Sequence, residues 1–525
     1  MQSILRNMGS KLDDHLLKRS FFCTYVLGLI AHGYCFTNQI ASHDALNNLY
    51  IAGRWNKAGL GRFFYPIYLS LTRGRILLPW LVGLLGLFWT SLAVYLIIRL
   101  FNIKKTGLIA AVSAIAVTNP TVYALAATYL HDFDADLFAL FLSVAAVSLW
   151  KRSLEEKKGK KYFLFLGAGA LVVSVCMGIY QSYVSVTIVL IMLISIEQLL
   201  NDRNWLDVLK QGLRGIFMLV LSAVFYMCEI FAFSRITGIS ILGNNSYNGL
   251  GNMSTLFSGG FIGKIGGAYL DFINSFLSLN SAYPKSVYLL IHGILAVSII
   301  GITLWGLRRV QLKNKVLIVL LGVLMPLGMN ISYILSGEMV HDIMKYAFWM
   351  IYLLAIVLMI WFNNARNVAD NVKKIINFLM IGCMTVIILG NIQTSNTIYL
   401  KKDLEYQATL SYMTRVIEKI EENESYIPGE TPVMFVGENA IGGTMNGFEE
   451  YETITGISSS SPITFYETYE KYFKYVLNIP LNLSEDEKIA EDERVIEMPE
   501  FPKTGSIQMI DGILVVKLES DYAEN

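Results

Sequence analysis

Long apolar runs dominate this sequence and limit what it can fold into. A helix needs roughly 20 mostly apolar residues to cross the hydrocarbon core of a bilayer. Only 16% of the residues are charged, against about 25% in soluble domains. We therefore predict an all-α polytopic membrane protein with about eleven spans. The spans are expected at 21–41, 76–98, 106–128, 133–150, 162–180, 183–200, 213–233, 286–307, 316–335, 346–362 and 375–391.

Basic residues alternate between the segments that connect these runs. One set of segments holds 23 Lys and Arg, and the other set holds nine. Lys and Arg are enriched in cytoplasmic loops, so we place the N-terminus inside and the C-terminal part outside. The basic set comprises residues 1–20, 99–105, 151–161, 201–214, 308–315 and 363–374.

The chain changes character near residue 392. From there onward 25 Asp and Glu stand against 10 Lys and Arg. Two stretches, 403–423 and 467–479, have helical periodicity, while PVMFVG and DGILVVKLES are typical of strands. We expect a small extracytoplasmic α/β domain at 392–525, a membrane domain at 21–391, and a cytoplasmic amphipathic helix at 1–20, which lacks a signal-peptide pattern.

Three aspartates stand between two apolar runs, in YLHDFDADLF at 129–138. On a helix Asp132 and Asp136 share a face, and Asp134 points elsewhere. Aspartates at a helix N-terminus can cap free N–H groups, which accounts for one of the three. Charges at membrane depth are costly and usually line polar cavities. Both interpretations stay open, and His131 and the three aspartates are candidate site residues.

The dipeptide His-Asp recurs at the expected outer boundary of the membrane. The three pairs are His43–Asp44, His131–Asp132 and His341–Asp342. A histidine can donate a hydrogen bond to a phosphate or orient a carboxylate. A metal site is an alternative, but the pairs lack the usual ligand spacing. We expect no cofactor, with a divalent metal left open.

The first loop, residues 42–75, breaks the positive-inside pattern. Its basic residues are Arg54, Lys57, Arg62, Arg73 and Arg75. Arginine matches the planar geometry of phosphate oxygens, so the four arginines are candidate ligands of a lipid-linked phosphate. Lipid headgroups are the alternative partner. The aromatic residues between them either lie at the membrane interface or support a sugar ring.

Asp44 lies in the same loop and is the candidate general base. Transfer of a sugar from a phosphate carrier needs a base for the acceptor proton and cations for the departing phosphate. A carboxylate beside basic residues stays ionised. We assign catalytic roles to Asp44 and Asp132. Glu229, in the seventh span, is expected to pair with Arg235 or to line the cavity.

A second long loop, residues 234–285, is rich in Gly, Asn and Ser. Such a composition is typical of a flexible linker. It also suits a mobile flap that closes over a cavity.

In layout and in two stretches, the chain resembles the Gtr-type bacterial glucosyltransferases, which belong to the multi-span GT-C class and modify O-antigen and related cell-wall polysaccharides. The stretches are SHDALNNLYIAGRW (42–55) and HDFDADLFALFLSV (131–144). The resemblance implies a GT-C-like fold and a sugar carried on undecaprenyl phosphate. It implies transfer of glucose or another hexose on the outer face of a bacterial plasma membrane, to a polysaccharide or its lipid-linked precursor.

The resemblance also implies roles for particular residues. Asp44 matches the first-loop acidic residue regarded as catalytic in this class. Family members often have an acidic pair there, and here His43 precedes Asp44. Asp132, Asp134 and Asp136 match the second acidic motif, whose role varies between metal binding and acceptor positioning.

Other functions stay open at this stage. A transporter or flippase of lipid-linked sugars would need polar residues along a path to both sides, whereas the candidate acids gather on one side. A polysaccharide polymerase or ligase would use the same chemistry with another donor, and a structural protein could recruit partners through its acidic tail. The expected partners are a polyprenyl-phosphate sugar, a glycan acceptor and membrane lipid, with no nucleic acid.

Overall fold

The computed structural model describes residues 14–38, 46, 55–74, 76–156, 159–239, 261–277, 283–336, 340–437, 448, 463, 466–479 and 481–518. Within them, eleven helical segments are long and apolar enough to cross a membrane, which confirms the expected number. Each overlaps one predicted span. Their helices are α2 (Asp14–Thr37), α6 (Pro79–Leu100), α7 (Thr106–Thr118) with α8 (Pro120–Thr128), α9 (Phe133–Glu155), α10 (Lys160–Met177), α11 (Val184–Leu200), α12 (Trp205–Thr237), α14 (Lys285–Leu307), α15 (Leu312–Met329), α17 (Met350–Asn364) and α18 (Asp370–Glu421).

Shorter helices connect the spans. Residues 1–13 of the predicted amphipathic helix lie outside the described residues, and α2 already begins at Asp14. The connecting helices are α4 (Asn56–Gly59), α5 (Tyr65–Thr72), η2 (Leu130–Asp132), η3 (Gln181–Tyr183), α13 (Phe261–Leu277), α16 (Ile331–Ser336), η5 (Asp342–Met344) and η6 (Tyr346–Trp349).

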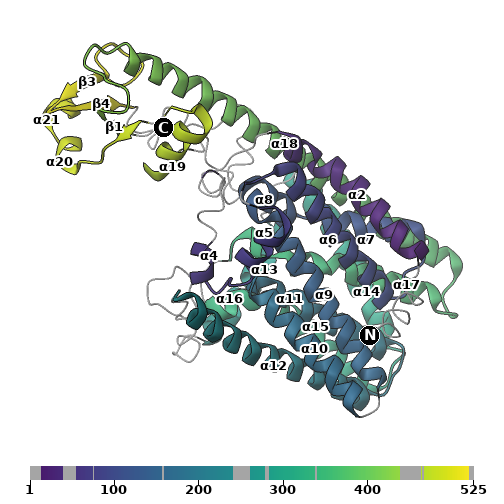
Figure 1. The fold of residues 1–525 in the computed structure, drawn as a ribbon. Helices are drawn as coiled ribbons and strands as arrows, with labels where there is room; N and C mark the ends of the chain where they lie inside the picture. Colours follow the sequence, from purple (N-terminus) through teal and green to yellow (C-terminus); the bar gives the residue numbers. More distant parts are fainter. Residues whose placement is uncertain are drawn as a thin grey trace.

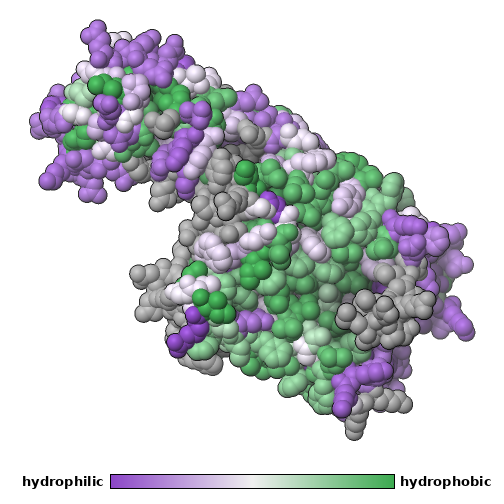
Figure 2. All heavy atoms as spheres, viewed as in Figure 1, coloured by the Kyte–Doolittle hydropathy of each residue, from purple (hydrophilic) through white to green (hydrophobic). Residues whose placement is uncertain are grey.

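Helix α9 lies inside the membrane body and packs against α6, α10 and α11. On one side α6 packs against α2 and α7, and on the other α10 packs against α12. Apolar side chains on α12, α14 and α15 face outward, among them Phe231, Leu290 and Val323, which are 62%, 63% and 56% exposed. Figure 2 shows this apolar surface over the body, with hydrophilic residues gathered on the C-terminal part. Lipid is the solvent that suits such a surface.

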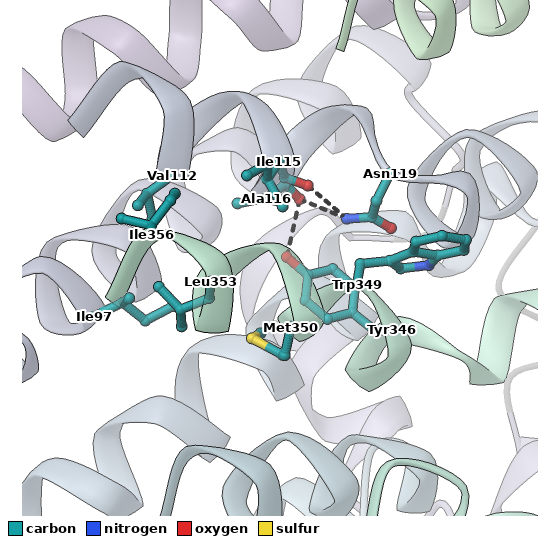
Figure 3. A pocket seen from close by; sticks show the side chains of 10 residues that line it. All are labelled: Ile97, Val112, Ile115, Ala116, Asn119, Tyr346, Trp349, Met350, Leu353 and Ile356. Carbon is teal, nitrogen blue, oxygen red and sulfur yellow. Dashed lines mark hydrogen bonds between the residues drawn. The ribbon is translucent and has the colours of Figure 1, made fainter. Parts of the chain in front are cut away.

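The third span is broken between α7 and α8, at Asn119 and Pro120. Proline has no N–H, so the carbonyl of Ala116 loses its helical donor. The Tyr346 hydroxyl donates to that carbonyl at 2.9 Å. The Asn119 amide donates to the Ile115 and Ala116 carbonyls at 2.9 and 3.2 Å. Figure 3 shows these bonds beside a cavity of about 20 Å³.

The break redirects the chain toward the His131–Asp132 pair. Asn119 also caps the new helix, because its Oδ1 accepts from Val122 N at 3.3 Å. Helix α8 ends at Thr128, and η2 follows after a single residue. Side chains from η6 and neighbouring helices thus replace the missing backbone bonds, as lipid-embedded breaks require.

Helix α18 runs without a break for 52 residues, from the membrane body into the C-terminal part. The domain boundary expected at residue 392 falls inside it. Several hydrogen bonds fix it along α2. Among them are His32 Nδ1 with the Tyr399 hydroxyl at 2.6 Å, Ser395 to the Ala31 carbonyl at 3.0 Å, and Tyr34 to Asp403 at 2.8 Å. Figure 1 shows α18 linking the two parts of the molecule beside α2.

The C-terminal part folds around a four-stranded sheet with the order β2-β1-β4-β3. Strand β1 pairs in parallel with β2 and β4, and β3 pairs antiparallel with β4. The expected strands PVMFVG and DGILVVKLES correspond to β1 and β4. The elements are β1 (Pro432–Val436), α19 (Tyr466–Lys471), the π-helix η8 (Tyr472–Leu477), β2 (Asn482–Leu483), α20 (Glu487–Ala490), α21 (Glu493–Ile496), β3 (Ile507–Ile510) and β4 (Ile513–Lys517).

Besides α18, two described residues pack between the C-terminal part and the membrane body. Leu46, from the first loop, is 4% exposed and packs in the core that α18 shares with the sheet, with Met413 and Val416. Phe448, from the C-terminal part, packs against the core of the membrane body. Each part therefore contributes a side chain to the core of the other.

Part of the loop at 234–285 is helical. Residues 261–277 form α13, and its Asp271 pairs with Lys345 at 2.9 Å. The same Lys345 ammonium donates to Ser275 at 3.1 Å. The flexible-linker prediction is therefore wrong for 261–277, while 240–260 and 278–282 lie outside the described residues.

We predict that Tyr346→Phe lowers stability by about 0.5–2 kcal/mol, because it removes a donor from the Ala116 carbonyl at the helix break. Thermal unfolding of the detergent-purified protein measures this. Tyr162→Phe is the matched control. The Arg214 guanidinium lies over the Tyr162 ring, and the Tyr162 hydroxyl makes no hydrogen bond among the described residues. Equal effects of the two substitutions would contradict the role of Tyr346.

Candidate active site

Three carboxylates are buried where α9 begins. Asp132 occupies the N-cap position and Asp134 and Asp136 lie in the first turn. They are 4%, 0% and 3% exposed. The Asp132 side chain makes no capping hydrogen bond, so its burial is not explained by capping. The positive end of the helix dipole faces all three, but buried carboxylates also need direct partners.

Lys57, on the short helix α4, is the partner of Asp132. Its ammonium donates to Asp132 Oδ2 and lies 3.1 Å from His131 Nε2. The two charged side chains are 15% and 5% exposed. Sequence reasoning placed Lys57 in the basic loop but did not select it as a site residue. The structure shows that this lysine, rather than one of the arginines, neutralises Asp132.

Arg73 is the partner of Asp134. The guanidinium lies 3.1 Å from Asp134 Oδ1 and donates to the His131 carbonyl. The Tyr68 hydroxyl donates to Asp134 Oδ2 at 3.2 Å and accepts from Trp89 Nε1 at 2.8 Å. With side chains 4% and 0% exposed, this pair is fully desolvated. Arg73 is thus a counter-ion of Asp134 rather than an available phosphate ligand.

Arg62 and Asp136 differ from these pairs. The Arg62 guanidinium lies over the Tyr180 ring, 4.1 Å from its centroid. Among the described residues it forms no hydrogen bond or salt bridge, and its Nε is buried. The carboxylate of Asp136 likewise has no hydrogen-bonded or ion-paired partner in the described part of the chain. Both groups belong to one electrostatic cluster with Asp132 and Lys57.

Side-chain hydrogen bonds to backbone carbonyls hold the first loop against the turn between α10 and α11. Gln181 Nε2 donates to the Leu60 carbonyl at 2.9 Å and to the Tyr226 hydroxyl at 3.0 Å. Tyr226 donates to the Gly61 carbonyl at 3.0 Å. A Cβ at Gly178 would lie 2.6 Å from the Phe63 ring, so this glycine permits the close approach. The loop is therefore held on both sides of Arg62.

Tyrosines of the loop and turn remain neutral. Burial raises the pKa of Tyr65 well above its ordinary value, and burial also raises the pKa values of Tyr68 and Tyr180. At neutral pH the phenols are therefore donors, and Tyr65 donates to the His131 carbonyl at 3.3 Å. Neutral Tyr180 offers Arg62 a cation–π contact and adds no negative charge beside it.

The structure does not bring every candidate residue to this cluster. Glu229 on α12 accepts from Ser174 at 2.9 Å, and its buried Oε2 has no hydrogen-bond partner among the described residues. The expected pairing with Arg235 is wrong, because that guanidinium lies over the Phe231 ring. His341 precedes η5 and makes no side-chain bond with the aspartates among the described residues. His43, Asp44, Arg54 and Arg75 lie outside the described residues.

Metal binding is not indicated by the described residues. In that part of the chain no group of three or more His, Cys, Asp and Glu side chains could hold a metal ion. Asp132 and Asp134 are each bound to a basic residue instead. The cluster balances three cations, Lys57, Arg62 and Arg73, against its three aspartates. Such a site can bind an anion at Arg62 and a hydroxyl group at Asp136.

Comparisons with known proteins give one match. The family model described as glucosyl transferase GtrII matches residues 33–362. This range contains the first loop, the three aspartates and the turn at Gly178. Searches of curated proteins and of solved structures return no match.

We predict that Arg73→Met lowers stability by about 3–5 kcal/mol, because it leaves the Asp134 carboxylate buried without its cation. Adding Asp134→Asn should recover about 2 kcal/mol, since the uncompensated charge is gone. Thermal unfolding measures both. Lys18→Met is the control, because the Lys18–Asp14 side chains are 73% and 71% exposed and exposed pairs contribute less than about 1 kcal/mol. If the double variant loses the sum of the stability losses of Arg73→Met and Asp134→Asn, the two side chains do not interact directly.

Proposed function

Because the chain belongs to the GtrII glucosyl transferase family and is a glycosyltransferase, we propose that it transfers glucose or another hexose from a polyprenyl-phosphate carrier. The acceptor is a cell-surface polysaccharide or its lipid-linked precursor. The reaction takes place on the outer face of a bacterial plasma membrane, within a GT-C-like membrane domain. The alternation of basic segments supports this orientation.

The main support for this proposal is Arg62, which we assign as the ligand of the carrier phosphate. It is the cation of the site that forms no salt bridge among the described residues, since Lys57 and Arg73 are bound to aspartates. Its guanidinium is oriented by the Tyr180 ring, and a planar guanidinium can bind two phosphate oxygens at once. Arg54 and Arg75 complete the anion site in this account.

Asp44 is the proposed general base. It removes the proton from the acceptor hydroxyl while that oxygen forms a bond to the anomeric carbon of the sugar. The bond between the anomeric carbon and the carrier phosphate oxygen breaks at the same time. Polyprenyl phosphate leaves with the bonding electron pair, and Arg62 stabilises the charge that develops on it.

Asp136 is the proposed ligand of the acceptor. Its buried carboxylate can accept hydrogen bonds from sugar hydroxyls, because no described side chain occupies it. Arg62 and Lys57 attract this carboxylate electrostatically, and Asp132 on the adjoining η2 repels it. Glu229 is a further proposed sugar ligand. Its Oε2 has no hydrogen-bond partner in the part of the chain that the structure describes, and it lies one turn from Tyr226, which is bonded to the first loop.

The C-terminal part is proposed to lie outside the cell, above the site. The core contact of Leu46 supports this, because Leu46 belongs to the same first loop as Lys57, Arg62 and Arg73. A polymerase or ligase would use the same base and phosphate site with a larger donor. A flippase would not need a base, so the loss of transfer on substitution of Asp44 distinguishes it.

We predict that Arg62→Gln lowers sugar transfer about 10²–10³-fold, because it removes a cation that stabilises the leaving phosphate. Stability should change little, since the Arg62 guanidinium forms no salt bridge with any described residue. The measurement is labelled hexose transferred from polyprenyl phosphate in membrane vesicles. Arg235→Gln is the matched control, another arginine over an aromatic ring. Normal transfer by Arg62→Gln would refute the phosphate assignment.

We predict that Asp44→Asn and Asp136→Asn impair transfer in different ways. Loss of the base lowers kcat about 10²–10⁴-fold, whereas loss of an acceptor ligand mainly raises the KM for the glycan. Kinetics at varied acceptor concentration separate the two. Asp207→Asn, an exposed first-turn aspartate on α12, serves as the control. If Asp136→Asn lowers kcat strongly and Asp44→Asn leaves kcat unchanged, the assignment of Asp44 as base and Asp136 as acceptor ligand is wrong.

A further inference from the structure

A cavity of about 560 Å³ lies between α2, α7, α17 and α18, away from the aspartates. Its α7 wall is built from small residues, namely Gly107, Ala110, Ala111 and Ala114. Small side chains at these four positions hollow out the wall. We call this cavity the α7–α18 groove.

The groove opens toward lipid. On its α18 wall, Ile381 and Leu389 are 47% and 53% exposed. The wall runs from Asn377 to Ile392, about 22 Å at 1.5 Å per residue. That length exceeds one leaflet of a hydrocarbon core about 30 Å thick. An acyl chain can therefore lie along the groove from the headgroup level inward.

Apart from Thr385, the polar side chains that line the groove gather at one end. Lys105 lines it there, directly before α7. Asn363 and Asn377 also line it, and their amides bond each other in both directions at 2.9 Å. Each amide has two N–H donors, so one N–H on each remains for a ligand within the described part of the chain.

The same end of the groove is strongly basic. The segments flanking it carry four more cations, Lys104, Arg366, Lys373 and Lys374, against the single acid Asp370. Helices α7, α17 and α18 contact one another, so these segments converge. Neither Lys105 nor these four residues form a salt bridge among the described residues. An anionic headgroup is the complement of this arrangement.

We propose that the α7–α18 groove is a binding site for an anionic glycerophospholipid. One acyl chain lies along the small residues of α7, the phosphate lies at Lys105, and the two asparagine amides donate to the ester or phosphate oxygens. The assignment of the headgroup to the cytoplasmic leaflet rests on the proposed orientation. The lipid class rests only on the groove and its cations. The site is separate from the transfer chemistry at Arg62.

Native mass spectrometry of the full chain tests this, with phosphatidylglycerol and phosphatidylcholine supplied in equal amounts. We expect the protein to retain phosphatidylglycerol preferentially. Lys105→Gln should reduce its retention about fivefold and leave phosphatidylcholine unchanged. Ala111→Phe should reduce retention of both lipids, because the ring fills the groove. Lys210→Gln and Val297→Phe are the controls, an exposed cation on α12 and a 70% exposed side chain on α14.

Three results would overturn the proposal. The first is equal retention of the two lipids by the unaltered protein. The second is unchanged retention by both Lys105→Gln and Ala111→Phe. The third is preference for added polyprenyl phosphate over phosphatidylglycerol, which would make the groove a carrier site. Sugar transfer is measured on the same samples, so a failure of the groove is distinguishable from a failure of the proposed function.

Discussion

The pairing of buried aspartates at the start of α9 with cations of the first loop is the interaction on which the site depends. A carboxylate in a low-dielectric interior is stable only beside a cation or strong donors. Lys57 and Arg73 supply these charges to Asp132 and Asp134. The pairs fold the loop onto the body, and this placement brings Arg62 beside Asp136 without giving either a described ion-pair partner. The two ion pairs thus hold the loop that carries Arg62 against the start of α9.

Two features of the scaffold set the position of this cluster. The break at Pro120 turns the third span so that η2 and α9 begin inside the body, and Tyr346 restores the lost hydrogen bond. Helix α18 connects the body to the C-terminal sheet, and Leu46 joins the first loop to the core of that part. The loop is therefore fixed at Leu46 by the C-terminal part and at Lys57 by the aspartates.

The spans were predictable because bilayer thickness and loop charge leave few alternatives. The continuity of α18 across residue 392 was not predictable. The change in hydropathy there reflects a change from lipid to water around the helix, while the backbone stays helical. The aspartates were identifiable as charges at membrane depth. Which cations form ion pairs was not predictable. The sequence shows five basic residues in one loop, but only packing decides that Lys57 and Arg73 pair with aspartates while Arg62 forms no salt bridge among the described residues. Nothing in the sequence around Tyr180 predicted its contact with Arg62.

We propose that the carrier phosphate binds at Arg62, and a cryo-EM structure of the full chain with bound polyprenyl-phosphate hexose tests this binding most directly. We predict phosphate oxygens within hydrogen-bond distance of the Arg62 guanidinium, with the sugar between it and Asp136. A phosphate bound elsewhere, with Arg62 still over Tyr180 and without an anion, would contradict it.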